Sequence, residues 1–183
     1  MHDFLINIAS SFTGVRFNSK LINSSSFIFF PGAVVSTIYE KNGDGSYESE
    51  KGEKKIIVPY CTEDENGENK LGLWHMDSLE EMVVGKWNIL EPPKELWGNP
   101  EKEVTPEELD MIMVPGVGFD RDGGRMGNGQ GYYDRTMEKV RPDCFLIALC
   151  YESQLFDNIL VAPHDVYMDK VVTEKEVYIG KGR

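Results

Sequence analysis

The chain has 183 residues, 40% of them hydrophobic and 27% charged, which is the composition of one globular domain and too short a length to expect two. Its net charge of −12 disfavours a general nucleic-acid or anionic-membrane surface. No apolar run approaches the about 18–20 residues of a membrane span. Three cysteines without CxxC spacing favour a reducing compartment, so we expect a cytoplasmic protein, and we expect it to be a monomer.

In the first half of the chain, short apolar runs alternate with polar segments rich in glycine and acidic residues. The pattern predicts short strands within residues 24–39, 56–60 and 71–76. Residues 41–55 predict a loop, and disorder is an open alternative for this segment. Ser78 is followed three residues later by Glu81, a capping-box pattern that predicts a short helix.

The second half of the chain is more regular. A short helix is expected at residues 105–110, because Thr105 is a capping residue and Pro106 suits the first helical position. The next segments predict a strand, a long glycine-rich loop, a helix and a fully buried strand, at residues 111–115, 116–131, 131–140 and 144–150. This order is that of a βαβ unit, whose ligands usually lie beyond the carboxyl end of the strand.

The fold class predicted is therefore α/β. We expect a single three-layer domain over residues 1–183, with a mostly parallel central sheet flanked by helices.

The glycine-rich loop is the most unusual feature, since seven of the 18 glycines lie between Gly116 and Gly131. Glycine at this density costs conformational entropy, so a structural role alone does not account for it. Gly127, Gly129 and Gly131 alternate just before the predicted helix, where glycine lets backbone amides approach a phosphate and the helix terminus adds partial positive charge. Residues 121–141 carry a net charge of +2, against −14 for the rest of the chain. This basic island is where a polyanion would dock.

Generic nucleotide motifs do not explain the loop. It contains no GxxxxGK[ST] run, and its glycines read GxGxG where a dinucleotide fingerprint needs GxGxxG. Glycine spacing alone therefore leaves an ordinary strand-to-helix crossover loop as an open alternative.

The residues around the glycines are more specific. Residues 115–135, PGVGFDRDGGRMGNGQGYYDR, closely resemble the signature of the 5-formyltetrahydrofolate cyclo-ligase family, also called methenyltetrahydrofolate synthetases. That signature has a Pro-Gly, a Phe-Asp, a Gly, an Arg-Leu-Gly, alternating glycines and a Tyr-Tyr-Asp. The resemblance extends to WNILEPP at 87–93 and to HDVYMDKVVTE at 164–174, and it covers residues 54–174.

The resemblance implies an enzyme that uses ATP and Mg²⁺ to convert 5-formyltetrahydrofolate into 5,10-methenyltetrahydrofolate, with release of ADP and phosphate. ATP phosphorylates the formyl oxygen, and the neighbouring anilino nitrogen attacks the activated carbon. Such a reaction needs little acid–base machinery, so positioning and charge neutralisation carry most of the catalysis.

Matching positions in the signature imply a role for each residue of the loop. Catalysis falls to Arg125, Tyr132 and Asp134. The nucleotide-binding set is Arg125, Met126, Gly127, Asn128, Gly129, Gln130, Gly131, Tyr132 and Tyr133. The folate substrate would contact Asn128, Gly129, Gln130, Gly131 and Tyr132. Magnesium would be held by Asp134 and Asp165, because it prefers one or two carboxylates plus phosphates and waters.

Structural alternatives stay open for several of these residues. Arg125 could be a solvated surface arginine, and Asp134 could simply complement a helix terminus. Tyr132 and Tyr133 either stack on a bound ring or pack the start of the helix. Two further residues, Trp74 and Met76, either wall a folate pocket or belong to the core, and strand alternation favours the core.

The first third of the chain departs from the family pattern. Family members begin with a basic helix that reaches ATP, followed by a folate-contacting Glu. Here Arg16 and Lys20 are the only candidates for the basic helix, and no Glu can be matched. We therefore expect residues 1–55 to be atypical, the amino-terminal part incomplete and activity impaired. A folate- or nucleotide-binding protein without turnover is the alternative, and an RNA-binding relative is disfavoured by the charge.

Overall fold

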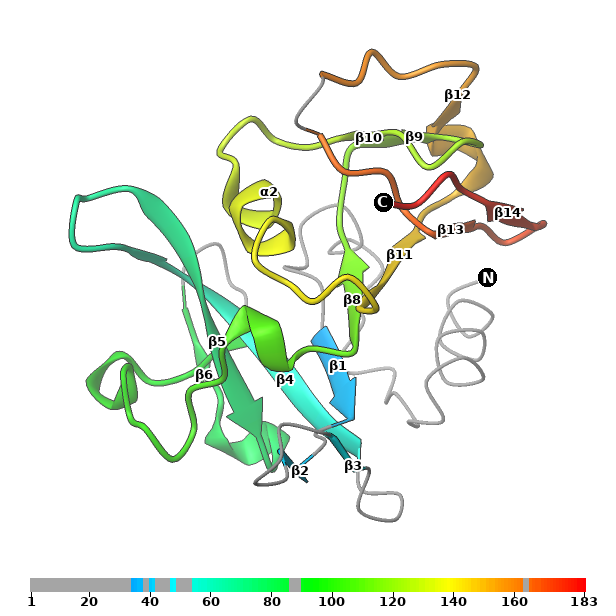
Figure 1. Ribbon diagram of the computed structural model, residues 1–183. Coiled ribbons are helices and arrows are strands. Elements are labelled where there is room, and N and C mark those ends of the chain that lie inside the picture. The colour runs from blue at the N-terminus through cyan, green and yellow to red at the C-terminus, as the bar shows by residue number, and fades with distance from the viewer. Residues whose placement is uncertain (1–33, 38–39, 42–46, 49–53, 86–89, 163–164) are drawn as a thin grey trace.

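The computed structural model describes residues 34–37, 40–41, 47–48, 54–85, 90–162 and 165–183. Their centre is a seven-stranded mixed sheet with the order β14-β13-β11-β8-β1-β4-β5 (Figure 1). In chain order its strands are β1 (Val34–Thr37), β4 (Lys54–Glu63), β5 (Asn69–Met76), β8 (Met111–Val114), β11 (Phe145–Leu149), β13 (Lys170–Val172) and β14 (Val177–Ile179).

Smaller elements surround this sheet. A three-stranded sheet has the order β10-β9-β12, and two-stranded sheets pair β2 with β3 and β6 with β7. These strands are β2 (Glu40–Lys41), β3 (Tyr47–Glu48), β6 (Val83–Val84), β7 (Leu90–Glu91), β9 (Gly118–Asp120), β10 (Arg125–Met126) and β12 (Leu155–Phe156). Among the described residues, the α-helix is α2 (Tyr132–Met137), and the 3₁₀ helices are η1 (Leu79–Glu81), η3 (Lys94–Leu96), η4 (Pro106–Glu108) and η5 (Glu152–Gln154).

The predicted βαβ unit is confirmed. β8 and β11 are parallel neighbours, and the chain between them forms α2. Both strands are largely buried and read as continuous apolar runs, as expected for strands covered by other elements. The carboxyl end of β8 therefore leads directly into the glycine-rich segment.

The expectation of a mostly parallel sheet is wrong. Within the described strands of this seven-stranded sheet, the β8–β11 and β11–β13 pairings are parallel and the other four pairings are antiparallel. β4 and β5 are joined by a tight turn in which Asp64 Oδ1 accepts hydrogen bonds from the amides of Asn66 and Glu68. A short connection of this kind can only join antiparallel strands, whereas a parallel pair needs a longer crossover.

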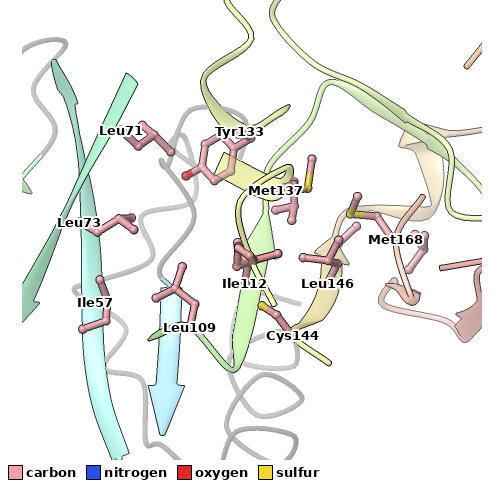
Figure 2. Packing of buried hydrophobic residues seen from close by; sticks show 14 of the residues in the cluster. Ile57, Leu71, Leu73, Leu109, Ile112, Tyr133, Met137, Cys144, Leu146 and Met168 are labelled. Atoms are coloured by element: carbon pink, nitrogen blue, oxygen red, sulfur yellow. The ribbon is translucent and has the colours of Figure 1, made fainter. Parts of the chain in front are cut away.

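Alternation along β4 and β5 separates two hydrophobic clusters. Ile57, Leu71 and Leu73 belong to the main core, whereas Val58, Tyr60, Trp74 and Met76 form a second cluster. Figure 2 shows Tyr133 and Met137 of α2 between Leu71 of β5 and Leu146 of β11. This packing places the start of α2 against the end of the β4–β5 hairpin.

The helix predictions hold in position but not always in length. α2 lies within the predicted segment 131–140. The two helices expected at residues 78–84 and 105–110 are the single 3₁₀ turns η1 and η4. Each is short because the residues that follow it adopt extended backbone. Their capping bonds are nevertheless present: the amide of Ser78 donates to Glu81 at 2.8 Å, and that of Thr105 donates to Glu108 at 3.0 Å. The three-layer arrangement stays a prediction.

Several predictions concern the first third of the chain. The loop expected at residues 41–55 is wrong for its described part, since β2 pairs with β3 and β4 already begins at Lys54. Residues 1–33, with Arg16 and Lys20, lie outside the described residues. Within the described ranges, no helix is long and apolar enough to cross a membrane.

Candidate functional site

The segment between β8 and α2 is not the open loop that its composition predicts. Residues Gly118–Asp120 and Arg125–Met126 pair as an antiparallel hairpin, β9–β10, and β12 extends it as a third strand. Only residues 127–131 then remain as an irregular connection to α2. Seven glycines thus serve two purposes: some permit the hairpin and its tight packing, and the later ones form the exposed connection.

Asp120 holds the hairpin turn and was not predicted as a site residue. Its side chain is buried, and Oδ1 accepts hydrogen bonds from the amides of Asp122 at 3.0 Å and Gly124 at 2.7 Å. Its other oxygen, Oδ2, accepts from the amide of Ile159 at 2.8 Å. A buried carboxylate with several amide donors fixes the turn that presents Arg125 at the start of β10. In the sequence, the only indication of this role was that Asp120 belongs to the Phe-Asp of the family signature.

Arg125 lies beneath the glycine connection and not on the open surface. Only 8% of its side chain is exposed, and its guanidinium donates to the carbonyl oxygen of Pro115 at 3.2 Å and to Asp134. A Cβ at Gly127 would lie 2.7 Å from Arg125 Nη1, so glycine is required for the guanidinium to occupy this place. The alternative of a solvated surface arginine is therefore wrong.

The connection itself faces solvent at its apex. Asn128, Gly129 and Gln130 are exposed, and a Cβ built on Gly129 would meet nothing within 4 Å. Gly129 and Gly131 have φ of 77° and 67°, a left-handed backbone that favours glycine. An exposed, glycine-dependent turn directly above a buried guanidinium can bring backbone amides and a positive charge to one anion.

The two tyrosines of the signature have different surroundings. Tyr133 is buried in the main core, so helix packing accounts for its ring. Tyr132 is half-buried, and its hydroxyl donates to Asn69 Oδ1 at 3.1 Å. Burial, with the neighbouring Cys61 and Glu63, raises the pKa of Tyr132, so the hydroxyl stays a donor at neutral pH. Trp74 and Met76 are buried in the second cluster, which confirms the core interpretation.

A group of hydrogen bonds between α2 and β5 had no counterpart in the sequence analysis. Arg135 Nε donates to the backbone oxygen of Asn69 at 2.6 Å, and Arg135 Nη2 donates to the backbone oxygen of Gln130 at 2.7 Å. Asn69 Nδ2 also donates to Gln130 Oε1 at 3.3 Å. Asn69 is more than sixty residues away from both Arg135 and Gln130, so no local pattern could have indicated its contacts with them.

Three of the five basic side chains of residues 121–141 are paired with carboxylates, Arg125 with Asp134 among them. Arg121 lies 3.7 Å from Glu152, and Arg141 pairs with Asp110. Asp110 directly precedes β8, whereas the glycine segment follows its far end, so Arg141 does not belong to the site. Because α2 spans only six residues, its terminal dipole is also weak. Arg125 and Arg135 are thus the basic side chains at the two ends of the glycine connection.

The two predicted magnesium ligands make separate contacts. Asp134 is paired with Arg125 and its side chain is 37% exposed, whereas Asp165 accepts a hydrogen bond from the amide of Ala162 at 2.7 Å. Over the described ranges, no group of three or more His, Cys, Asp or Glu residues could hold a metal ion. These donors fit Mg²⁺ only if most of its ligands are phosphate oxygens and waters, which is its usual habit in nucleotide sites.

Comparisons with known proteins match the part of the chain that contains the glycine segment. A model of the 5-formyltetrahydrofolate cyclo-ligase family matches residues 48–174. The mitochondrial 5-formyltetrahydrofolate cyclo-ligase of Arabidopsis thaliana is 36% identical over 138 residues, which are 68% of this chain and 49% of that protein. The enzyme of the same name from Mycolicibacterium smegmatis is 33% identical over 66% of this chain and 60% of its own.

A solved structure gives the same result. The 5,10-methenyltetrahydrofolate synthetase of Aquifex aeolicus, determined by NMR, is 32% identical with a TM-score of 0.53, over 69% of this chain and 60% of its own. The chain thus spans about half to three-fifths of the length of these relatives. With the match over residues 48–174 and the Arg125-to-Asp134 signature in place, the chain belongs to the 5-formyltetrahydrofolate cyclo-ligase family.

Proposed function

We propose that this chain carries the nucleotide- and folate-contacting segment of a 5-formyltetrahydrofolate cyclo-ligase. The observation that carries the proposal is the exposed turn at residues 128–130, which lies beyond the carboxyl end of β8 with the Arg125 guanidinium fixed beneath it. Ligands of α/β sheets commonly bind at this position relative to a parallel strand. Because the chain spans only part of its relatives, the activity itself is an inference from this segment.

In the proposed reaction, the formyl oxygen of 5-formyltetrahydrofolate attacks the γ-phosphorus of ATP, and ADP leaves. The neighbouring anilino nitrogen then attacks the formyl carbon and loses its proton to solvent, and cleavage of the carbon–oxygen bond releases phosphate and 5,10-methenyltetrahydrofolate. Charge develops on phosphate oxygens in both steps. Arg125 would neutralise that charge by exchanging its bond with Asp134 for one with a phosphate oxygen, and the amides of residues 127–131 would orient the phosphates.

The remaining proposed ligand contacts lie mostly in the same segment. Asn128, Gln130 and Tyr132 would contact both ligands from the exposed side of the turn, and Met126 is exposed beside them. Asp134 and Asp165 would hold Mg²⁺, which would supply charge neutralisation on the transferred phosphate. We further propose that the protein acts as a cytoplasmic monomer on this small molecule.

The decisive experiment is a coupled spectrophotometric assay for the methenyl product, with ATP and Mg²⁺ present or withheld. We expect product only when both are present, and loss of product when a chelator removes Mg²⁺. Calorimetric titration of the same protein with ATP and with 5-formyltetrahydrofolate separates turnover from binding. Binding of either ligand without product would establish the alternative of a non-catalytic binding protein, and absence of binding would refute both.

A further inference from the structure

Residues 127–131, the glycine connection, form the turn proposed to bind the nucleotide, here called the nucleotide turn. Asn69 is the residue at which the β4–β5 hairpin meets this turn. It is the first residue of β5 and pairs with Glu63 across the end of the hairpin. Its side-chain amide contacts two residues of the signature: Nδ2 donates to Gln130 Oε1 at 3.3 Å, and Oδ1 accepts from the Tyr132 hydroxyl at 3.1 Å. One side chain therefore fixes residues on both sides of Gly131.

A third contact makes this arrangement a closed network. The backbone oxygen of Asn69 accepts from Arg135 Nε at 2.6 Å, and Arg135 Nη2 in turn donates to the backbone oxygen of Gln130 at 2.7 Å. A Cβ at Gly131 would lie 2.8 Å from Arg135 Nη1, so the turn is closely fitted around that guanidinium. Gln130 is thus held by its side chain through Asn69 and by its backbone through Arg135.

The apex of the turn, between its two ends, has no comparable fit. Asn128 and Gly129 are exposed, and Gly129 has open space around it. A glycine-containing turn of this kind samples many backbone conformations unless its ends are held. The Asn69 network holds the end next to α2, while Arg125 and Gly127 hold the end next to β10.

We propose that Asn69 is a positioning residue for the nucleotide turn, acting through Gln130 and Tyr132. The inference rests on the proposed function, since it takes those two residues as ligand contacts. Asparagine suits the role because one short amide supplies both a donor and an acceptor. The Arg135 contact uses only the backbone of Asn69, so it persists when the side chain is replaced, and α2 stays docked against β5.

Asn69→Ala and Asn69→Asp separate the two side-chain contacts. Alanine removes both of them, whereas aspartate keeps the acceptor for Tyr132 and loses the donor to Gln130. Asn66→Ala is the matched control, because Asn66 is an exposed asparagine in the turn of the same hairpin. Hydrogen exchange of the amides at 127–132 reports the order of the turn directly, and calorimetric titration with Mg-ATP reports its consequence.

We expect Asn69→Ala to accelerate exchange at residues 127–132 and to weaken Mg-ATP binding by about tenfold, from the loss of two hydrogen bonds. In the assay its KM for ATP should rise more than its kcat falls. Asn69→Asp should show a smaller change, and Asn66→Ala should match the wild type. Unchanged exchange and affinity in Asn69→Ala would overturn the inference.

The readouts keep this inference apart from the proposed function. If the wild type binds Mg-ATP but forms no methenyl product, exchange and affinity still decide the role of Asn69. If the wild type turns over and Asn69→Ala behaves identically, only the positioning role is lost. Should Asn69→Ala fail to fold, Asn69→Asp carries the test, and its thermal unfolding must match that of Asn66→Ala.

Discussion

Arg125 of β10 and Asp134 of α2 form an ion pair in which the arginine side chain is 8% exposed and the aspartate side chain is 37% exposed. The pair joins the two ends of the glycine connection, because Arg125 precedes it and Asp134 lies in the first turn of the helix after it. The family signature implies a phosphate contact for the arginine and a magnesium contact for the aspartate. In the structure, each of these charges neutralises the other.

Replacing either member of this pair should therefore affect both stability and activity. Asp134→Asn leaves the Arg125 charge poorly compensated beneath the turn, and we expect it to lower the free energy of unfolding by about 2 kcal/mol, less than the about 3–5 kcal/mol for a fully buried pair. Arg125→Ala should reduce kcat/KM by at least about 100-fold, as expected when a charge-stabilising donor is removed. Urea denaturation and the methenyl assay measure the two effects.

Arg121→Ala is the control for this test. Arg121 lies on the same hairpin, its side chain is 52% exposed, and its 3.7 Å approach to Glu152 is a surface pair. Such pairs contribute about 0–1 kcal/mol. Equal loss of activity in Arg121→Ala and Arg125→Ala would contradict the site assignment.

Gly129 and Gly67 provide a matched pair for testing the turn. Their φ angles are 77° and 78°, and a Cβ at either position would meet nothing within 4 Å. Alanine should therefore cost the same backbone strain at both, about 1–2 kcal/mol. Only Gly129 lies in the proposed nucleotide turn, so only Gly129→Ala should also weaken Mg-ATP binding in a titration. An equal loss of affinity in Gly67→Ala would show that general destabilisation is responsible.

The sequence predicted the βαβ unit because its signals are local. The apolar runs of β8 and β11, and the polar, glycine-rich segment between them, specify strand, crossover and strand without reference to the rest of the chain. The composite signature also contains both members of the Arg125–Asp134 ion pair, because the two residues are only nine positions apart. Parallel pairing of the remaining strands failed because short turns, such as that at residues 64–68, impose the antiparallel direction.

Long-range partners account for what the sequence could not provide. Asn69 contacts Gln130 and Tyr132 from a strand more than sixty residues away, and nothing in NGENK distinguishes that asparagine from its neighbours. The charge count of residues 121–141 misled for the same reason. It grouped Arg141 with the site, although Arg141 pairs with Asp110 at the opposite end of β8.

An ion-pair group on the edge of the second cluster should make stability depend on acidic pH. Lys102 Nζ donates to Asp77 at 2.6 Å and to Glu81 at 2.8 Å. The bond from Lys102 lowers the pKa of Asp77 from 3.8. Burial raises the pKa of Glu81, but the bonds from Lys102 and the amide of Ser78 outweigh it and lower that pKa from 4.5. Depressed carboxylate pKa values stabilise the fold above the unfolded values and lose that effect as pH falls.

Lys102→Met tests this dependence, because methionine keeps much of the apolar stem while removing the charge. The difference in Tm from the wild type should be greatest near about pH 7 and should shrink as pH falls from about 5 to about 3. Lys94→Met, which removes an exposed lysine, should show no such trend. A Tm difference that is constant across this range would contradict the assignment.

The three free cysteines should differ sharply in reactivity. Cys144 and Cys150 are buried immediately before and after β11, and burial raises the pKa of each thiol to about 12. Since only the thiolate attacks an alkylating reagent, both should resist iodoacetamide in the folded protein at neutral pH. Cys61 is half-buried on β4 beside Tyr132 and should react first. Mass spectrometry of the labelled protein measures the order, and labelling in urea should abolish it. Equal labelling of Cys61 and Cys144 in the native protein would mean that β11 is not buried within the core. That result would also contradict the parallel pairing of β11 with β8, which precedes the glycine connection.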